Sequence, residues 1–172
     1  PLVGMEPAVK PACLHTRSGV VGVLATERSL DGELFRRTAA RYGRGIEVVT
    51  APGKGFVELV ESDREATPEA EECVRRAMAG MLERGADQIV LGCTHYPFLM
   101  PVFRRIVAGR DVTIIDPSPA VARRTAQLLD QYGLRAAPDH RPTYEFRTFA
   151  DEAYRERLRA KAFADADTPA AR

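Results

Sequence analysis

The sequence predicts an α/β fold, in which an open, mostly parallel sheet carries helices on both faces. Short apolar runs rich in β-branched residues alternate along the chain with longer segments whose apolar residues recur at helical spacing. The apolar runs are continuous, as expected of parallel strands that are buried on both faces. Strands separated by helices of this length pair in parallel through right-handed crossovers.

The first strand is expected at Val20–Ala25, a run with the sequence VVGVLA. Leu30–Tyr42 follows with apolar and charged residues at helical spacing and predicts a helix. Ile46–Thr50 predicts the second strand. A loop rich in proline and glycine then leads to the short apolar run Phe56–Glu61.

The middle of the chain predicts two more helices around a third strand. Thr67 is a typical N-cap residue with Pro68 at the first helical position, and Gly85 marks the end of that helix. Gln88–Leu91 predicts the strand, and Phe98–Val107 predicts the second helix.

The last third of the chain continues the alternation. Val112–Ile115 predicts the fourth strand and Pro119–Tyr132 a helix, followed by a weak strand at Tyr144–Phe149 and a final helix at Glu152–Phe163. Asp165–Arg172 is polar and rich in alanine, so we expect it to fray.

Composition and charge exclude several classes of protein. With 172 residues, 45% of them hydrophobic and 28% charged, the chain is typical of a globular domain and unlike a disordered or collagen-like one. A net charge of +1 favours neither nucleic acid nor a membrane as partner, and no apolar run has the length of about 18 residues that spans a bilayer. Three widely spaced cysteines favour a reducing cytoplasm over a secreted disulfide framework.

The strongest chemical signal follows the third predicted strand, where Cys93 and His95 flank Thr94. Ligands of open parallel sheets bind outside the carboxyl ends of the strands. A thiol acts as base or nucleophile only as thiolate, which a neighbouring imidazolium stabilises. Glu61 could bring a carboxylate into the same crevice. The alternatives are a small buried Cys93, a capping His95 and a solvent-facing Glu61.

Other motifs are weaker. Cys13 and His15 form a second Cys-x-His pair that could meet the first around zinc, although neither pair has the usual ligand spacing. Cys73 is expected in the core of a helix face and inert. The PGKG loop at 52–55 lacks the rest of a phosphate-binding motif, and the glycines around the first strand do not complete a dinucleotide fingerprint. We therefore expect no nicotinamide cofactor.

The segment Leu91–Leu99 (LGCTHYPFL) resembles the second catalytic motif of glutamate racemases, cofactor-independent enzymes that supply D-glutamate for peptidoglycan. Further stretches resemble the same family in the same order, and the resemblance covers about residues 1–150. These stretches are Val3–Ala12, Gly22–Thr26 and Phe56–Glu61.

The resemblance implies catalysis by two opposed thiol groups, one from each of two similar α/β domains, which remove the α-proton of glutamate on one face and deliver a proton to the other. Cys93 matches the second of these cysteines. Thr94 and His95 are implied to contact the substrate, and His95 also to assist Cys93. Glu61 matches an acidic residue that supports this side of the site.

Thr26 and Ser29 match a Thr-x-x-Thr pattern that lies near the substrate in the family, although Ser29 departs from the usual threonine. The resemblance implies no pyridoxal phosphate and no metal. Glutamate is the expected small-molecule partner, and a homodimer is one assembly to be considered.

The first domain of the family carries an Asp-Ser-Gly motif and a Cys-Asn-Thr motif, and neither occurs here. We therefore expect a carboxyl-terminal fragment: 1–114 as the second domain, 115–150 as a segment that returns to the first domain, and 151–172 as a terminal helix and frayed tail. Such a fragment should be inactive alone and should expose an apolar patch. The patch is expected at Ile115, Val121, Leu128 and Leu129.

Three alternatives stay open. Another amino-acid racemase, of the aspartate or hydantoin type, is the enzyme alternative, although His-Tyr-Pro after Gly-Cys-Thr favours glutamate. A non-catalytic zinc-binding module on the two Cys-x-His pairs is the second. A racemase-derived interaction protein without catalysis is the third.

Overall fold

The computed structural model describes residues 2–4 and 8–164 of the chain. Contacts divide the chain into two compact units, residues 1–134 and 135–172. The first unit holds the sheet, and the second holds the last helix. None of the helices in the described ranges has the length and apolar character needed to cross a membrane. The predicted frayed tail, 165–172, lies outside these ranges.

Four parallel strands form one open sheet in the order β2-β1-β3-β4. This arrangement confirms the predicted α/β class with a parallel sheet. The two central strands are the most completely buried, in agreement with their continuous apolar sequences. The strands are β1 (Val20–Ala25), β2 (Glu47–Pro52), β3 (Gln88–Leu91) and β4 (Thr113–Ile115).

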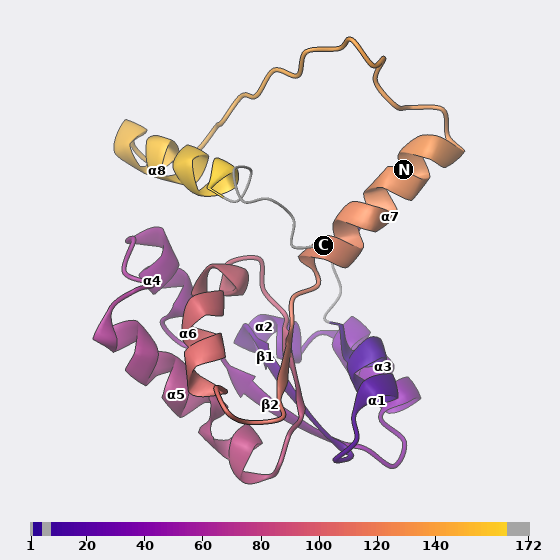
Figure 1. Ribbon diagram of the computed structural model, residues 1–172, viewed down its shortest axis with the longest axis vertical. Helices are drawn as coiled ribbons and strands as arrows, with labels where there is room; N and C mark the ends of the chain where they lie inside the picture. The colour runs from indigo at the N-terminus through magenta and orange to yellow at the C-terminus, as the bar shows by residue number, and fades with distance from the viewer. Residues whose placement is uncertain (1, 5–7, 165–172) are drawn as a thin grey trace. The chain divides into compact units, whose positions relative to one another are not determined.

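Helices cover both faces of the sheet, with α1 and α3 on one side of the strands and α4, α5 and α6 on the other (Figure 1). The helices of the first unit are α1 (Val9–His15), α2 (Glu27–Leu30), α3 (Glu33–Tyr42), α4 (Phe56–Glu61), α5 (Pro68–Glu83), η1 (Tyr96–Leu99, a 3₁₀ turn), α6 (Met100–Ile106) and α7 (Ser118–Gln131).

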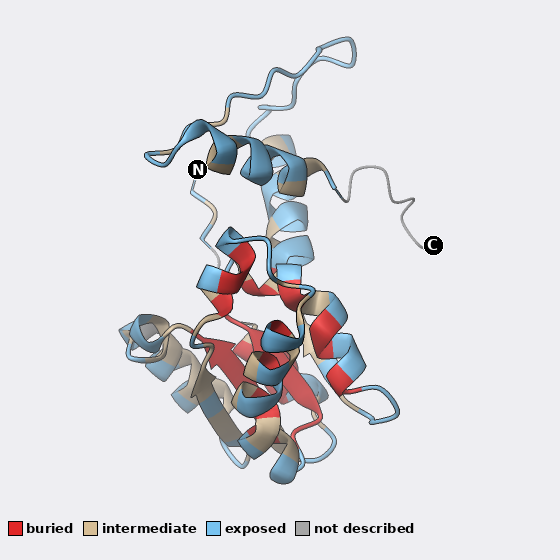
Figure 2. Cartoon of the chain, turned by 90° about the vertical axis from the view of Figure 1, so that its left-hand side faces the viewer, coloured by how far each residue is buried: buried red, intermediate tan, exposed pale blue. Residues whose placement is uncertain are grey.

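Successive strand residues point to opposite faces and so build two separate hydrophobic clusters. Val23 and Val90 pack with α1 on one face. Leu24, Ile89 and Leu91 pack with α4, α5 and α6 on the other. Figure 2 shows the buried residues concentrated in the strands and in the helix surfaces around them.

A buried carboxylate holds the amino-terminal edge of the sheet together. Asp87, which is 7% exposed, accepts hydrogen bonds from the Thr16 hydroxyl (2.6 Å) and from the N–H groups of Arg17 (2.6 Å) and Ser18 (3.0 Å). Burial alone would raise the pKa of the Asp87 carboxyl, but these hydrogen bonds outweigh burial and hold the pKa below its usual value.

Several predicted helices have different boundaries in the structure. The helix expected at 30–42 is two helices, because Gly32 adopts an extended conformation (ψ 139°) between α2 and α3. The short run 56–61 is helix α4. The helix expected at 98–107 begins two residues earlier, as η1, and continues as α6. Helix α1 was not expected from the sequence; its Pro11 lies in the first turn, where a missing N–H costs no intrahelical hydrogen bond.

The strand expected at Tyr144–Phe149 is wrong, because this segment forms no strand in the second unit. Two of its aromatic rings pack instead on Phe163 of helix α8 (Glu152–Phe163), with ring centroids 5.0 Å away for Tyr144 and 5.9 Å for Phe146. The aromatic residues that favoured a strand therefore cover a helix.

The residues of the expected apolar patch have mixed exposure. Ile115, Val121 and Leu129 are half-buried, as expected, whereas Leu128 is buried at 8% exposure and the expectation for it is wrong. Leu128 is the one buried residue of α7, and Val121 and Leu129 on the same helix are partly exposed.

Candidate active site

The site is built where strands β1, β2 and β3 end at the same edge of the sheet. The Gly92 N–H donates to the carbonyl oxygen of Leu24 (2.7 Å), and the Gly53 N–H donates to that of Ala25 (3.1 Å). These bonds extend the parallel pairing one residue past each strand. Cys93 therefore follows a buried central strand at the edge where open sheets bind ligands.

Cys93, His95 and Glu61 form a contiguous row of side chains. The Sγ atom of Cys93 lies 4.0 Å from Nδ1 of His95. The other ring nitrogen of His95, Nε2, lies 3.3 Å from Oε1 of Glu61. The structure thus brings together three of the residues that the sequence singled out, from two segments 34 positions apart in the chain.

Local structure explains this placement. The Tyr96 N–H donates to the carbonyl oxygen of Cys93 (3.2 Å), which closes a tight turn and opens η1. Glu61 is the last residue of α4, and that helix starts immediately after Gly55. Gly55 has φ +81°, a left-handed conformation that glycine adopts without strain and that turns the chain from β2 into α4.

The geometry permits proton transfer at the Cys93 thiol. A carboxylate beside Nε2 orients the imidazole, with Nδ1 on the side of the sulfur. The side chains of His95 and Glu61 are 31% and 43% exposed, so water screens their attraction. Cys93 itself is half-buried.

The other expected substrate contacts lie close to these strand ends. Thr26 follows β1 and caps α2: its hydroxyl accepts the Ser29 N–H (3.2 Å) and lies 2.8 Å from the Ser29 hydroxyl. This cap is sufficient to explain both residues structurally. Thr94 is exposed on the Cys93 turn. That these three residues bind substrate stays a prediction.

Tyr96 is a residue of this site that the sequence reasoning missed. It is 1% exposed, and its hydroxyl donates to the carbonyl oxygen of Gly53 (3.4 Å). Burial raises the pKa of the Tyr96 phenol, and the nearby charge of Cys93 raises it further. The sequence did offer a signal for Tyr96, because this tyrosine directly follows the Cys-x-His pair and the chain has a glycine loop at 52–55 on which its ring could pack.

The second Cys-x-His pair does not meet the first. Cys13 is 6% exposed and packs in the cluster on the α1 face, where burial raises the pKa of its thiol, whereas Cys93 packs against the cluster on the opposite face. Nδ1 of His15 lies 2.7 Å from the carbonyl oxygen of Pro11 on its own helix. Within residues 2–4 and 8–164, no three potential ligands converge on one point. The geometry is therefore against the zinc-module alternative.

Cys73 is also placed differently from the expectation. It is half-buried at the margin of the core instead of inside it, and its thiol donates to the carbonyl oxygen of Lys54 (3.2 Å). Its thiol is therefore committed to the loop between β2 and α4.

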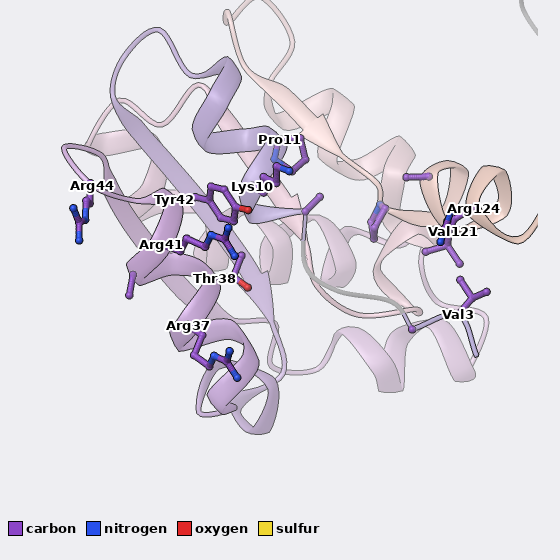
Figure 3. A pocket seen from close by; sticks show the side chains of 15 residues that line it. Val3, Lys10, Pro11, Arg37, Thr38, Arg41, Tyr42, Arg44, Val121 and Arg124 are labelled. Carbon is purple, nitrogen blue, oxygen red and sulfur yellow. The ribbon is translucent and has the colours of Figure 1, made fainter. Parts of the chain in front are cut away.

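A separate groove of about 960 Å³ lies between α1, α3 and α7. Its lining is mostly apolar, with cationic side chains that include Lys10, Arg41 and Arg124 and with no acidic residue among the described ones (Figure 3). Lys10 Nζ and Arg41 Cζ both lie over the Tyr42 ring, at 5.4 and 5.3 Å from its centroid. Cys93, His95 and Glu61 do not line this groove.

Comparisons with known proteins place most of the chain in one family. Residues 1–125 match the family model described as Asp/Glu/Hydantoin racemase. The chain is 48% identical over 134 residues to a glutamate racemase of Roseiflexus sp. strain RS-1, which covers 78% of this chain and 49% of the relative. It is 46% identical over 143 residues to a glutamate racemase of Pseudomonas syringae pv. tomato, with 83% and 52% covered.

A solved structure shows the same architecture. The glutamate racemase of Escherichia coli, determined with L-glutamate and the activator UDP-MurNAc-ala, aligns with a TM-score of 0.67 at 31% identity, over 81% of this chain and 51% of that protein. The chain thus spans about half the length of the relatives that it matches. The family-model match over residues 1–125 and the identity to these relatives show that the chain belongs to the Asp/Glu/hydantoin racemase family.

Proposed function

We propose that this chain supplies one half of the active site of a glutamate racemase, which interconverts L- and D-glutamate without a cofactor. The observation that carries the proposal is the row Cys93–His95–Glu61, with its distances of 4.0 Å and 3.3 Å, at the carboxyl edge of a parallel sheet. The identities of 46–48% to glutamate racemases support glutamate as the substrate.

In the proposed mechanism, the Cys93 thiolate removes the α-proton from one face of glutamate, or its thiol delivers a proton to that face. His95 stabilises the thiolate and Glu61 orients His95. Thr94, Thr26 and Ser29 hold the substrate beside the thiol. A second acid/base group must work on the opposite face of the α-carbon, because inversion requires the proton to leave one side and arrive on the other.

We propose that the opposite group comes from a first domain and that residues 1–114 are the second domain, 115–150 return to the first, and 151–172 form the terminal helix and tail. Neither remaining cysteine fills the role here, because Cys13 is buried on the other face and the thiol of Cys73 is bonded to Lys54. The 172-residue chain alone is therefore proposed to be inactive. Its cytoplasmic location and assembly as a homodimer stay predictions.

The test is racemisation by the whole protein that contains this chain. Circular dichroism of the reaction mixture follows the loss of optical activity of L-glutamate, and proton NMR in D₂O follows exchange at Cα. Cys93→Ser should lower the rate by at least about 100-fold, the minimum expected for loss of a positioned acid/base group. Turnover of aspartate with no turnover of glutamate would establish the enzyme alternative and reject the proposal.

A second function is favoured by the groove between α1, α3 and α7. The Escherichia coli structure holds an activator that is a uridine diphosphate derivative. The groove here offers cationic groups on three helices beside an apolar surface, which suits a ligand with phosphates and an organic body. We propose that it binds a nucleotide-diphosphate activator.

Binding of UDP to the 172-residue chain, measured by calorimetry, tests this second function. Arg41→Gln should weaken binding by at least about tenfold if Arg41 contacts a phosphate. Arg75→Gln removes the same charge from α5, where Arg75 pairs with Glu71 instead, and should leave binding unchanged. Equal weakening by both variants would show a non-specific charge effect and reject the groove.

A further inference from the structure

Tyr96 occupies the junction between the two segments that carry the proposed site. It stands three residues after Cys93, to which its N–H is bonded, and its ring is buried against α4. The ring meets Phe56, the first residue of α4, edge-on, with centroids 5.0 Å apart and an interplanar angle of 68°. Because Glu61 ends the same short helix, any shift between Tyr96 and Phe56 is transmitted to Glu61 within two turns.

The hydroxyl of Tyr96 adds a second connection to that helix. It donates to the carbonyl oxygen of Gly53, which also accepts the Phe56 N–H (3.2 Å). Gly53 packs closely against the rings of Tyr96 and Phe56. A Cβ atom at position 53 would be 2.5 Å from the Tyr96 hydroxyl oxygen and 2.7 Å from a ring carbon of Phe56. The absence of a side chain at position 53 therefore allows the loop to pack closely on both rings.

These contacts complete a closed circuit of neighbours. Side-chain contacts join Cys93 to His95 and His95 to Glu61. Helix α4 joins Glu61 to Phe56, whose ring packs on Tyr96. The backbone hydrogen bond from Tyr96 to Cys93 closes the circuit. The link between Phe56 and Tyr96 joins two buried aromatic rings, which are 0% and 1% exposed. The His95–Glu61 contact is exposed and weak by itself, so its geometry depends on the rigid side of the circuit.

We infer that Tyr96 is a positioning residue that holds Glu61 against His95 and thereby sets the reactivity of Cys93. This inference rests on the proposed function for its catalytic meaning, because the reactive group is the thiol proposed as acid/base. The physical claim concerns this chain alone. Without the Tyr96 hydroxyl, α4 is held less firmly to the Cys93 turn, the Glu61 carboxylate is held less closely against Nε2 of His95, and His95 is positioned less well beside the Cys93 thiol.

The experiment measures alkylation of Cys93 by iodoacetamide in the 172-residue chain between pH 6 and 9, with the Cys93 peptide quantified by mass spectrometry. Tyr96→Phe, which keeps the ring, should slow alkylation at pH 7 by about three- to tenfold, a range typical of losing one net hydrogen bond. Glu61→Gln should slow it by at least as much. The double variant should be no slower than Glu61→Gln, since coupled residues act non-additively.

Two further variants separate positioning from general loosening of the core. Phe103→Leu alters a ring that packs on Phe56 from α6, with centroids 6.0 Å apart, and should leave Cys93 alkylation unchanged. Gly53→Ala changes none of Cys93, His95 or Glu61, yet should slow alkylation as Tyr96→Phe does. It also provides the result if Tyr96→Phe fails to fold.

Three outcomes would overturn the inference: an unchanged rate in Tyr96→Phe, additive effects of Tyr96→Phe and Glu61→Gln, or an equal slowing in Phe103→Leu. A whole protein that does not racemise glutamate would reject the proposed function but would leave these alkylation rates, and the inference drawn from them, intact.

Discussion

The Asp87 side chain stabilises the segment that leads into β1, at the amino-terminal edge of the sheet and away from the candidate active site. Its carboxylate accepts three hydrogen bonds from residues 16–18, which fix the entry into β1. We expect Asp87→Asn to lower the free energy of unfolding by about 1–3 kcal/mol, because the amide group cannot accept all three bonds. Urea titration measures the change.

The effect of Asp87 should depend on pH. Its folded pKa lies below the usual value of 3.8, so its contribution is fully present above pH 3.8 and is lost as the pH falls through the lower, folded pKa. The difference between wild type and Asp87→Asn should therefore shrink only in strongly acidic solution. Asp111→Asn is the control: Asp111 pairs with Arg17 but is 82% exposed, and its loss should cost little. A gap between wild type and Asp87→Asn that stays constant down to pH 2 would contradict this assignment.

Two glycines provide a prediction about packing between elements. A Cβ at Gly22 of β1 would meet Met81 of α5 at 2.6 Å, but the contact is with a flexible thioether that can move. A Cβ at Gly53 would meet the rigid rings of Tyr96 and Phe56. Gly53→Ala should therefore destabilise the chain by about 1–3 kcal/mol, and Gly22→Ala by less. Thermal unfolding of both variants ranks them, and the reverse order would show that the α4 loop yields more readily than α5.

The N-cap of α5 offers a test of a single helix. The Thr67 hydroxyl accepts the Ala70 N–H (3.3 Å) and Pro68 occupies the first helical position, as the sequence predicted. Thr67→Ala should cost about 1 kcal/mol, and Thr67→Ser should restore most of it. Equal losses in the two variants would mean that the methyl group, and not the hydroxyl, stabilises this end.

At the level of elements, the sequence predicted all four strands, because buried parallel strands have a distinctive continuous apolar pattern, and most of the longer helices, but not α1. It failed where tertiary contacts decided the outcome. Tyr144 and Phe146 have strand-forming side chains but pack on Phe163. The break at Gly32 and the first-turn Pro11 of α1 depend on local backbone geometry that periodicity does not register.

The sequence predicted the part of the site that depends on residue type and position along the chain, and missed the part that depends on a tertiary backbone contact. Cys93 and His95 are two positions apart in the sequence, so their contact could be anticipated, and Glu61 was placed near them by its position at the end of an apolar run. Tyr96 was missed because its partner, Gly53, is 43 positions away and acts through its backbone. A carbonyl oxygen has no signature in the sequence.

At the scale of the whole molecule, the two units should behave independently. Residues 135–150 hold no regular structure, and α8 is stabilised within its own unit by Phe163. A chain ending at Leu134 should therefore unfold at the same midpoint as the 172-residue chain, measured by circular dichroism. Trypsin should cleave first within 135–150, after Arg135 or Arg147, which lie outside helices and strands. A lowered midpoint would show that the second unit supports the first.

The strand order determines which strands of the sheet open first in local unfolding. β1 and β3, which lead into Thr26 and Cys93, are the inner strands, while β2 and β4 have one partner each. Local opening of a sheet begins at its borders and reaches the interior only when the whole unit unfolds. In hydrogen–deuterium exchange, the amides of Val90 and Leu91 should be among the slowest in the chain. The thiol of Cys93 is thus tethered to the part of the protein that opens last.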